Sequence, residues 1–153
     1  WASFNLDAAE WRFHVTKTGA DHIVPLSSQA LAVLRELHPL TGGGRYVFQG
    51  AWNRTRPMSE NTVLQALRRL GYTKEQMSGH GFRATARTLL AENGWKPDAI
   101  ERQLSHKASG PLKDAYDRTQ FLSERRLMMQ AWADCLDTLA RGDNKVVSIG
   151  VAA

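Results

Sequence analysis

The hydrophobic pattern near the start of the chain predicts a β-hairpin. In the segment AEWRFHV, apolar Trp11, Phe13 and Val15 alternate with polar residues, as in a half-buried strand. The segment KTGAD has turn chemistry, with Gly19 free to adopt positive φ, and the apolar run HIVPL follows it. We therefore predict a hairpin over residues 9–26. Because two strands alone are marginally stable in water, a further strand or helix is expected to cover it.

Apolar residues spaced three and four apart predict helices after the hairpin. Ser27 or Ser28 can cap a helix that ends at Pro39 and the Gly42–Gly44 run. Its predicted buried stripe consists of Ala30, Val33, Leu34 and Leu37. The RYVF segment at 45–48 suggests a short strand or a buried extended piece.

Three further helices and a long final helix are predicted downstream. One opens at Ser59 and stops at Gly71, and another runs from about Phe82 to Asn93, before Gly94. A shorter one starts near Pro97, which a first helical turn tolerates. The stripes of these helices are Val63, Leu67 and Leu70 in the first, Ile100 and Leu104 in the short one, and Met128, Ala131, Trp132, Cys135 and Leu139 in the final one.

This order of elements predicts a mainly helical α+β fold, with an N-terminal β-hairpin followed by a helical bundle. No internal repeat, low-complexity tract or linker divides the 153 residues, so we expect one domain. Residues 143–153 are predicted to be a strand-like or loose C-terminal tail. The early hairpin without a cover suggests that the chain is part of something longer.

Charge and cysteine content narrow the class of protein. Lys and Arg total 20 against 15 acidic residues, a net charge of +5, which suits a polyanionic partner but also serves solubility in many small domains. The single cysteine, Cys135, excludes an internal disulfide and a thiolate zinc site. No apolar run is long enough for a membrane span, and the N-terminus does not resemble a signal peptide. We expect no metal, no cofactor and a reducing compartment such as the bacterial cytoplasm.

The segment Gly79-His80-Gly81-Phe82-Arg83 carries the first candidate chemistry. Positions three apart share a helix face, so the imidazole of His80 and the guanidinium of Arg83 can reach one ligand. A helix N-terminus also favours an anion, and together these groups suit a phosphate. Taken alone, such a pair is more often a capped helix with a surface arginine.

The rest of the series changes that interpretation. Lys17 lies at the hairpin tip, His106 follows His80 by 26 residues, and Tyr116 follows His106 by ten. Lysine, histidine–arginine, histidine and tyrosine in this order resemble the tyrosine recombinases, particularly phage and genomic-island integrases. The segments HIVPLS, GHGFRATARTLLAENG, QLSHK and AYDRTQFLSERRLMMQAWADCLD extend the resemblance over roughly residues 1–140.

The resemblance implies a role for each residue of the series. Tyr116 would attack the scissile phosphate, leaving a 3′-phosphotyrosine and a free 5′-hydroxyl. Arg83 and His106 would bind non-bridging oxygens, and His80 would manage the tyrosine proton or order the phosphate. Lys17 would protonate the leaving 5′-oxygen. The implied partners are duplex DNA at attachment sites, other copies in a synaptic tetramer, and accessory excisionase and DNA-bending proteins; a fragment could be monomeric.

Two departures from the family pattern affect the expected activity. The family places a first catalytic arginine in a helix before the WASFNLD-like segment, and no residue here matches it. We therefore expect a partial catalytic domain over 1–153 that cleaves poorly or not at all by itself. Phe121 lies where relatives often carry another tyrosine, which leaves Tyr116 as the nucleophile, since Tyr46 and Tyr72 have the wrong contexts.

Other residues receive weaker assignments. Candidate contacts to the DNA backbone are Arg54, Arg56, Arg68, Arg69, Lys74 and Arg87, of which Arg54 and Arg56 are preferred; each taken singly is more often an ordinary solvated charge. Structural roles are expected for His14, His22, His38, Cys135, Trp11, Trp95 and Trp132. The alternatives are a non-catalytic DNA-binding module with the same fold and, more distantly, a type IB topoisomerase-like enzyme.

Overall fold

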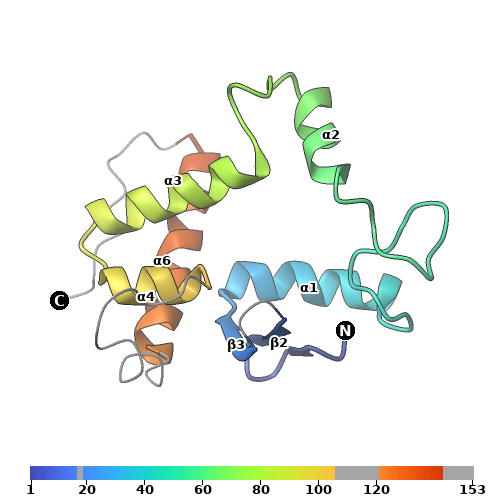
Figure 1. The fold of residues 1–153 in the computed structure, drawn as a ribbon, viewed down its shortest axis with the longest axis horizontal. Helices are drawn as coiled ribbons and strands as arrows, with labels where there is room; N and C mark the ends of the chain where they lie inside the picture. The colour runs from blue at the N-terminus through green and yellow to red at the C-terminus, as the bar shows by residue number, and fades with distance from the viewer. Residues whose placement is uncertain (17–18, 106–120, 143–153) are drawn as a thin grey trace.

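The computed structural model describes residues 1–16, 19–105 and 121–142, and it begins with a small antiparallel sheet (Figure 1). The strands are β1 (Phe4–Asn5), β2 (Glu10–Val15) and β3 (Ala20–Pro25), in the order β1-β2-β3. Trp11 of β2 lies opposite both Phe4 and Val24, and its ring stacks on Phe4 at a centroid distance of 5.5 Å. The predicted hairpin is confirmed, and β1 supplies a further strand on one of its edges.

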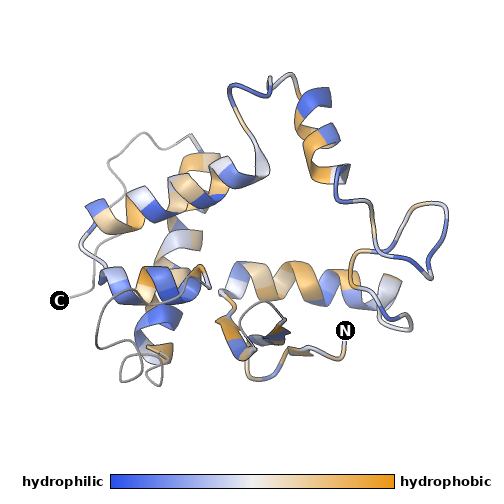
Figure 2. Ribbon diagram, in the orientation of Figure 1, coloured by the Kyte–Doolittle hydropathy of each residue, from blue (hydrophilic) through white to orange (hydrophobic). Residues whose placement is uncertain are grey.

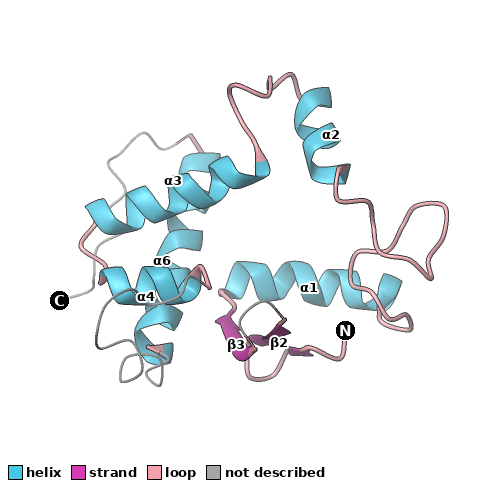
Figure 3. Cartoon of the chain, in the orientation of Figure 1, coloured by secondary structure: helices cyan, strands magenta, loops and turns pink. Residues whose placement is uncertain are grey.

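Helices make up most of the remaining described chain (Figure 3). They are α1 (Ser28–Thr41), α2 (Thr62–Arg69), α3 (Gly79–Glu92), α4 (Pro97–Gln103) and α6 (Leu122–Ala140). This arrangement confirms the mainly helical α+β fold with the strands first. None of the helices in the described ranges is long and apolar enough to cross a bilayer.

The start of α1 and its end at the Gly42–Gly44 run agree with the sequence, but Pro39 does not end the helix. The Ser27 side chain accepts a hydrogen bond from the Ala30 amide, as an N-cap serine does. Pro39, predicted to end the helix, lies inside it, and the helix continues to Thr41 before the cap at Gly42. Inside a helix, proline removes the hydrogen bond to the carbonyl four residues earlier and its ring crowds that carbonyl. The helix nevertheless continues past this local defect to Thr41. Val33 is 59% exposed, so the predicted stripe is only partly buried.

The region between α1 and α3 departs most from prediction. Residues 45–48 form no strand, although Val47 is buried; the only bridge described nearby pairs Gln49 with Pro57. The α2 helix begins at Thr62 rather than at Ser59, whose hydroxyl accepts from the Asn61 amide instead. Figure 1 shows α2 held away from the other helices by long loops. Burial along its stripe is accordingly limited to Leu67.

The principal core lies where α3, α4 and α6 meet. It consists of Leu90, Trp95, Ile100, Met128 and Cys135. The predicted packing roles of Trp95 and Cys135 are confirmed, since they are 3% and 4% exposed. Leu139 is 54% exposed, so the apolar stripe of α6 stops contributing to the core before the helix ends. Figure 2 shows the mixed hydropathy of these helices, as expected for elements with one face in solvent.

The α6 helix also joins this core to the sheet and α1. The Gln29 amide of α1 donates to the carboxylates of Asp134 and Asp137 at 2.7 and 2.9 Å. Gln130 accepts from the Ser28 amide at 2.9 Å. Arg126 reaches the buried carboxylate of Glu10 on β2. Polar contacts therefore fix the position of α6 against the N-terminal third of the chain.

Candidate functional site

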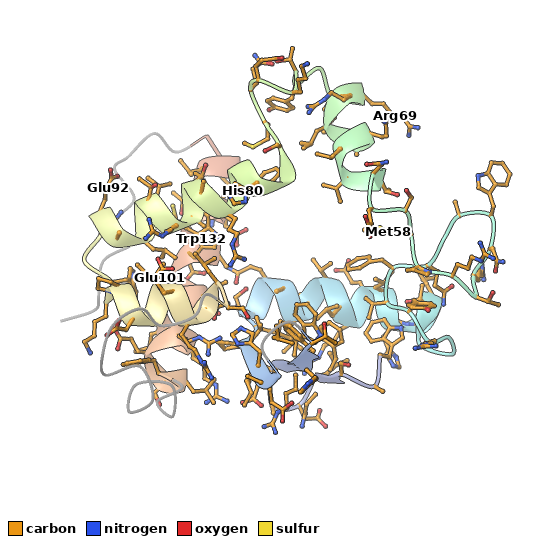
Figure 4. All side chains as sticks on the ribbon, viewed as in Figure 1. Met58, Arg69, His80, Glu92, Glu101 and Trp132 are labelled. Carbon is orange, nitrogen blue, oxygen red and sulfur yellow. The ribbon has the colours of Figure 1, made fainter. Side chains whose placement is uncertain are left out.

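The first turn of α3 combines a serine cap with the absence of acidic residues, which are features that favour an anion. Ser78 caps the helix, and its hydroxyl accepts from the Gly81 amide at 3.1 Å. The helix begins at Gly79, three residues earlier than predicted, so His80 and Arg83 both lie in its first turns. Figure 4 shows His80 at the N-terminal end of α3, opposite the end that carries Glu92. No acidic residue occupies this turn, so the positive end of the helix dipole is not neutralised locally.

Gly81 keeps the backbone of this turn close to the preceding loop. A Cβ added at position 81 would lie 3.2 Å from the Met77 sulfur and 3.6 Å from the Ser78 hydroxyl. The first distance is tighter than ordinary van der Waals contact, and the second involves the capping group itself. Glycine at this position therefore leaves room for the cap, while His80 is exposed and Arg83 is half-buried.

Arginine side chains from three helices, α3, α4 and α6, act electrostatically on one buried histidine of β3. His22 of β3 is 3% exposed, and its Nε2 has no hydrogen-bond partner in the described part of the chain. Burial, together with the positive charges of Arg125, Arg102 and Arg83, lowers the pKa of His22 from 6.5 to about 4. A hydrogen bond with the Gln103 backbone acts in the opposite direction. His22 is therefore neutral at physiological pH, and Arg83 belongs to a basic cluster rather than standing alone.

Arg125 of α6 is the most deeply buried member of this cluster. It is fully buried, with its Nε donating to the Gln103 side chain at 2.9 Å and an Nη donating to the Ile23 carbonyl at 2.5 Å. Burial lowers the pKa of Arg125 to about 10, with a smaller contribution from Arg102. Arg125 stays protonated at neutral pH, so the cluster includes a positive charge that is buried in the protein.

Sequence reasoning assigned His22 a structural role and did not single out Arg102 or Arg125. One signal was present for Arg125. It is spaced three residues from Met128 and seven from Trp132, so it occupies the apolar stripe of α6. A charged residue at such a position is usually buried with a specific partner. The sequence around His22 and Arg102 carries no comparable signal, because the residues that surround them come from distant parts of the chain.

Three of the five predicted catalytic residues fall in segments that the structure does not describe. Lys17, His106 and Tyr116 lie outside the described residues. Of the predicted series, the structure thus places His80 and Arg83 on one helix turn, and the roles of all five remain predictions.

The six candidate DNA contacts lie on several elements. Arg54 and Arg56 are exposed in the loop before α2, as is Lys74 after it, and Arg69 is exposed on α2 itself. The guanidinium of Arg68 donates to the carbonyls of Tyr72 and Met77, and Arg87 forms an ion pair with Glu101 at 2.6 Å. Contact with DNA stays a prediction for each; Arg68 and Arg87 already make intramolecular bonds.

An apolar groove elsewhere on the molecule is chemically unlike this site. It has a volume of about 720 Å³ and is bordered by the sheet, α1 and the loop that leads to α2. Its lining includes Phe4, Trp11, Val33, Phe48 and Met58. None of its lining residues belongs to α3, α4 or α6, so it is separate from the basic cluster.

The described side chains offer no metal-binding group. In residues 1–16, 19–105 and 121–142, no three His, Cys, Asp or Glu side chains gather as metal ligands would. The described side chains in the first turns of α3 include the imidazole of His80 and the guanidinium of Arg83, and such hydrogen-bond donors suit a phosphate.

Several known proteins similar to this chain are named integrases. The integrase of Enterobacteria phage P4 is 43% identical over 97% of this chain, which covers 37% of that protein. Prophage integrase IntA of Escherichia coli is 39% identical over 93% of the chain and 35% of its own length. The integrase of Shigella phage Sf6 is 40% identical over 78% of the chain and 31% of its own length.

The chain thus spans about a third of the length of these relatives. No solved structure matches it significantly. The sequence pattern of the phage integrase family matches residues 1–121, which include the hairpin, the first turn of α3 and α4. With that match and relatives at about 40% identity, the chain belongs to the phage integrase family.

Proposed function

We propose that the protein carrying this chain performs site-specific DNA recombination as an integrase, cutting and rejoining strands through a 3′-phosphotyrosine intermediate. The observation that carries the proposal is the first turn of α3, where His80 and Arg83 share a capped, acid-free helix start next to a basic cluster. Such a turn suits a phosphate group. The integrase names of the relatives favour DNA as the source of that phosphate.

In the proposed mechanism Tyr116 is the nucleophile. A phenol ordinarily has a pKa of about 10, so it is mostly protonated at neutral pH and needs nearby cations or a base to react. Its oxygen attacks the scissile phosphorus, a phosphotyrosine bond forms, and the bond to the 5′-oxygen breaks. The energy of the broken bond is kept in the new one, so rejoining requires no nucleotide cofactor.

Cationic side chains would stabilise this reaction without a metal. Charge develops on the non-bridging oxygens of the phosphate, and fixed donors lower the barrier there. Arg83 and His106 fill that role in the proposal, and His80 orders the phosphate or handles the tyrosine proton. The leaving 5′-alkoxide needs a proton, which Lys17 supplies.

The 153-residue chain by itself is proposed to be weakly active. The family pattern contains a first catalytic arginine, and we propose that these 153 residues hold no counterpart to it. Loss of one such donor removes roughly 3–4 kcal/mol of transition-state stabilisation.

The whole protein is proposed to act in the bacterial cytoplasm on duplex attachment sites as a synaptic tetramer, with excisionase and DNA-bending proteins as accessory partners.

A nicked suicide duplex carrying the attachment site tests the proposal. The full-length protein is expected to form a denaturant-stable covalent adduct with the duplex, and Tyr116→Phe to abolish it. Tyr72→Phe is the matched control, because Tyr72 is an exposed tyrosine outside the proposed series. DNA binding without an adduct would instead identify a non-catalytic DNA-binding module. Relaxation of supercoils without site preference would indicate a topoisomerase-like activity.

A further inference from the structure

Arg125 connects three elements through one side chain. It belongs to α6, its Nε donates to the side chain of Gln103 at the end of α4, and its Nη donates to the carbonyl of Ile23 in β3. The residue is fully buried, so these bonds are shielded from water. A guanidinium is planar and presents its donors in a fixed fork, and two acceptors held this way fix each other's position.

Each of these three elements leads directly to a proposed catalytic residue. Lys17 precedes β3 by three residues, and His106 follows the end of α4 at Gln103 by three residues. Tyr116 precedes the start of α6 at Leu122 by six residues. The contacts of Arg125 therefore hold together β3, α4 and α6, the three described elements that are next in sequence to these residues.

The same cluster reaches the fourth element of the site. His22, next to Ile23 on β3, interacts electrostatically with Arg125, Arg102 and Arg83. Arg83 comes from α3, which packs with α4 and α6 around the core. The basic cluster thus links the phosphate-binding turn to the three elements that Arg125 joins.

Stability alone does not require an arginine at position 125, because apolar side chains could fill the same space. Burying a guanidinium is costly, and apolar replacements of similar volume often leave a protein equally stable. The neighbouring stripe positions Met128 and Cys135 show that α6 can be held by apolar contacts. What the arginine adds to apolar packing at this position is directional hydrogen bonds to β3 and α4.

We propose that Arg125 is a positioning residue of the strand-cleavage site, whose bonds to Gln103 and Ile23 hold β3, α4 and α6 in the arrangement that cleavage requires. The proposal rests on the proposed recombinase function. It assigns no contact between Arg125 and DNA.

The test compares single-turnover adduct formation with DNA affinity in the full-length protein, using the nicked suicide duplex at saturating protein. Arg125→Met and Arg125→Lys are both expected to slow adduct formation about 10- to 100-fold, the scale of small misplacements of reacting groups. DNA affinity should change less than about threefold. Lysine retains the charge but cannot donate along both directions of the fork, so it should not restore the rate.

Arg141→Met is the matched control at the C-terminal end of the same helix. It removes the same charge from an exposed side chain whose Nε donates to the Asp137 carbonyl of α6 itself. Its adduct rate should stay near that of the wild type. Equal losses in Arg141→Met and Arg125→Met would overturn the proposal in favour of a general charge effect, and so would full restoration by lysine.

A second variant keeps the inference testable if Arg125→Met does not fold. Gln103→Leu removes the acceptor on α4 and leaves Arg125 in place, and it should slow adduct formation while binding is retained. In a double-mutant cycle with Arg125→Lys, the two losses should be less than additive, because both act through one bond. A normal rate in Gln103→Leu refutes the positioning role. Failure of the wild type to form any adduct refutes the proposed function instead.

Discussion

Acid should destabilise this chain through His22. The pKa of the buried imidazole is lowered from 6.5 to about 4, first by burial and then by the charges of Arg125, Arg102 and Arg83. Because the folded pKa lies below the unfolded value, the unfolded chain binds the proton more readily between these two pH values. Stability present above pH 6.5 is therefore lost as the pH falls toward 4.

The size of the effect follows from the pKa difference. Each pKa unit corresponds to about 1.4 kcal/mol, so acidification to pH 5 should cost about 2 kcal/mol through this group. The full loss, reached near the folded pKa of about 4, is about 3 kcal/mol. Carboxylates also titrate in this range, so the contribution of His22 must be taken as a difference between variants.

Urea unfolding at pH 7.5, 6, 5 and 4.5 measures that difference. His22→Gln keeps an amide that can bond the Gln103 backbone but does not titrate, so its stability should fall less with acid than that of the wild type. His14→Gln is the matched control, since His14 lies on the neighbouring strand with its side chain 58% exposed. Parallel stability curves for the wild type and His22→Gln would refute the assignment of a buried neutral imidazole.

Two further outcomes are expected. Arg83→Gln should lower the adduct rate of the full-length protein by about 10²–10³, the scale for one lost oxyanion donor, with DNA affinity nearly unchanged; a normal single-turnover rate contradicts the role of this residue. Met128→Ala should lower the free energy of unfolding by about 2–5 kcal/mol, because Met128 is fully buried in the principal core. Leu127→Ala is its control, since Leu127 is 64% exposed, and equal losses in urea titrations would show that the core is placed wrongly.

Local patterns predicted the strands and helix starts that depend on local chemistry. Alternation around Trp11 and Phe13 marked the hairpin, and Ser27 and Pro97 marked helix starts that the structure confirms. Pro39 misled because an interior proline disfavours a helix by a limited free energy, and the remaining turns of α1 continue past it. The stripe of α2 misled because periodicity reports which face is apolar and not whether anything covers it.

Only the residues of the candidate site that are close together in the sequence could be predicted to lie together. His80 and Arg83 are three residues apart, so helix geometry alone places them together. His22, Gln103 and Arg125 come from three separate elements, and no local pattern brings them to one place. The hydrogen bonds of Arg125 span 22 residues to Gln103 and 102 to Ile23, and only the tertiary fold shows them.

The single cysteine has a practical consequence for spectroscopy. Cys135 is 4% exposed and lies in the principal core, where burial raises the pKa of its thiol. A thiol that is both covered and protonated reacts slowly with maleimides, because the thiolate is the attacking species. A fluorophore can therefore be attached to a cysteine introduced at an exposed site without first replacing Cys135. In the unmodified chain, the rate at which the Cys135 thiol is labelled reports how often the core between α3, α4 and α6 opens.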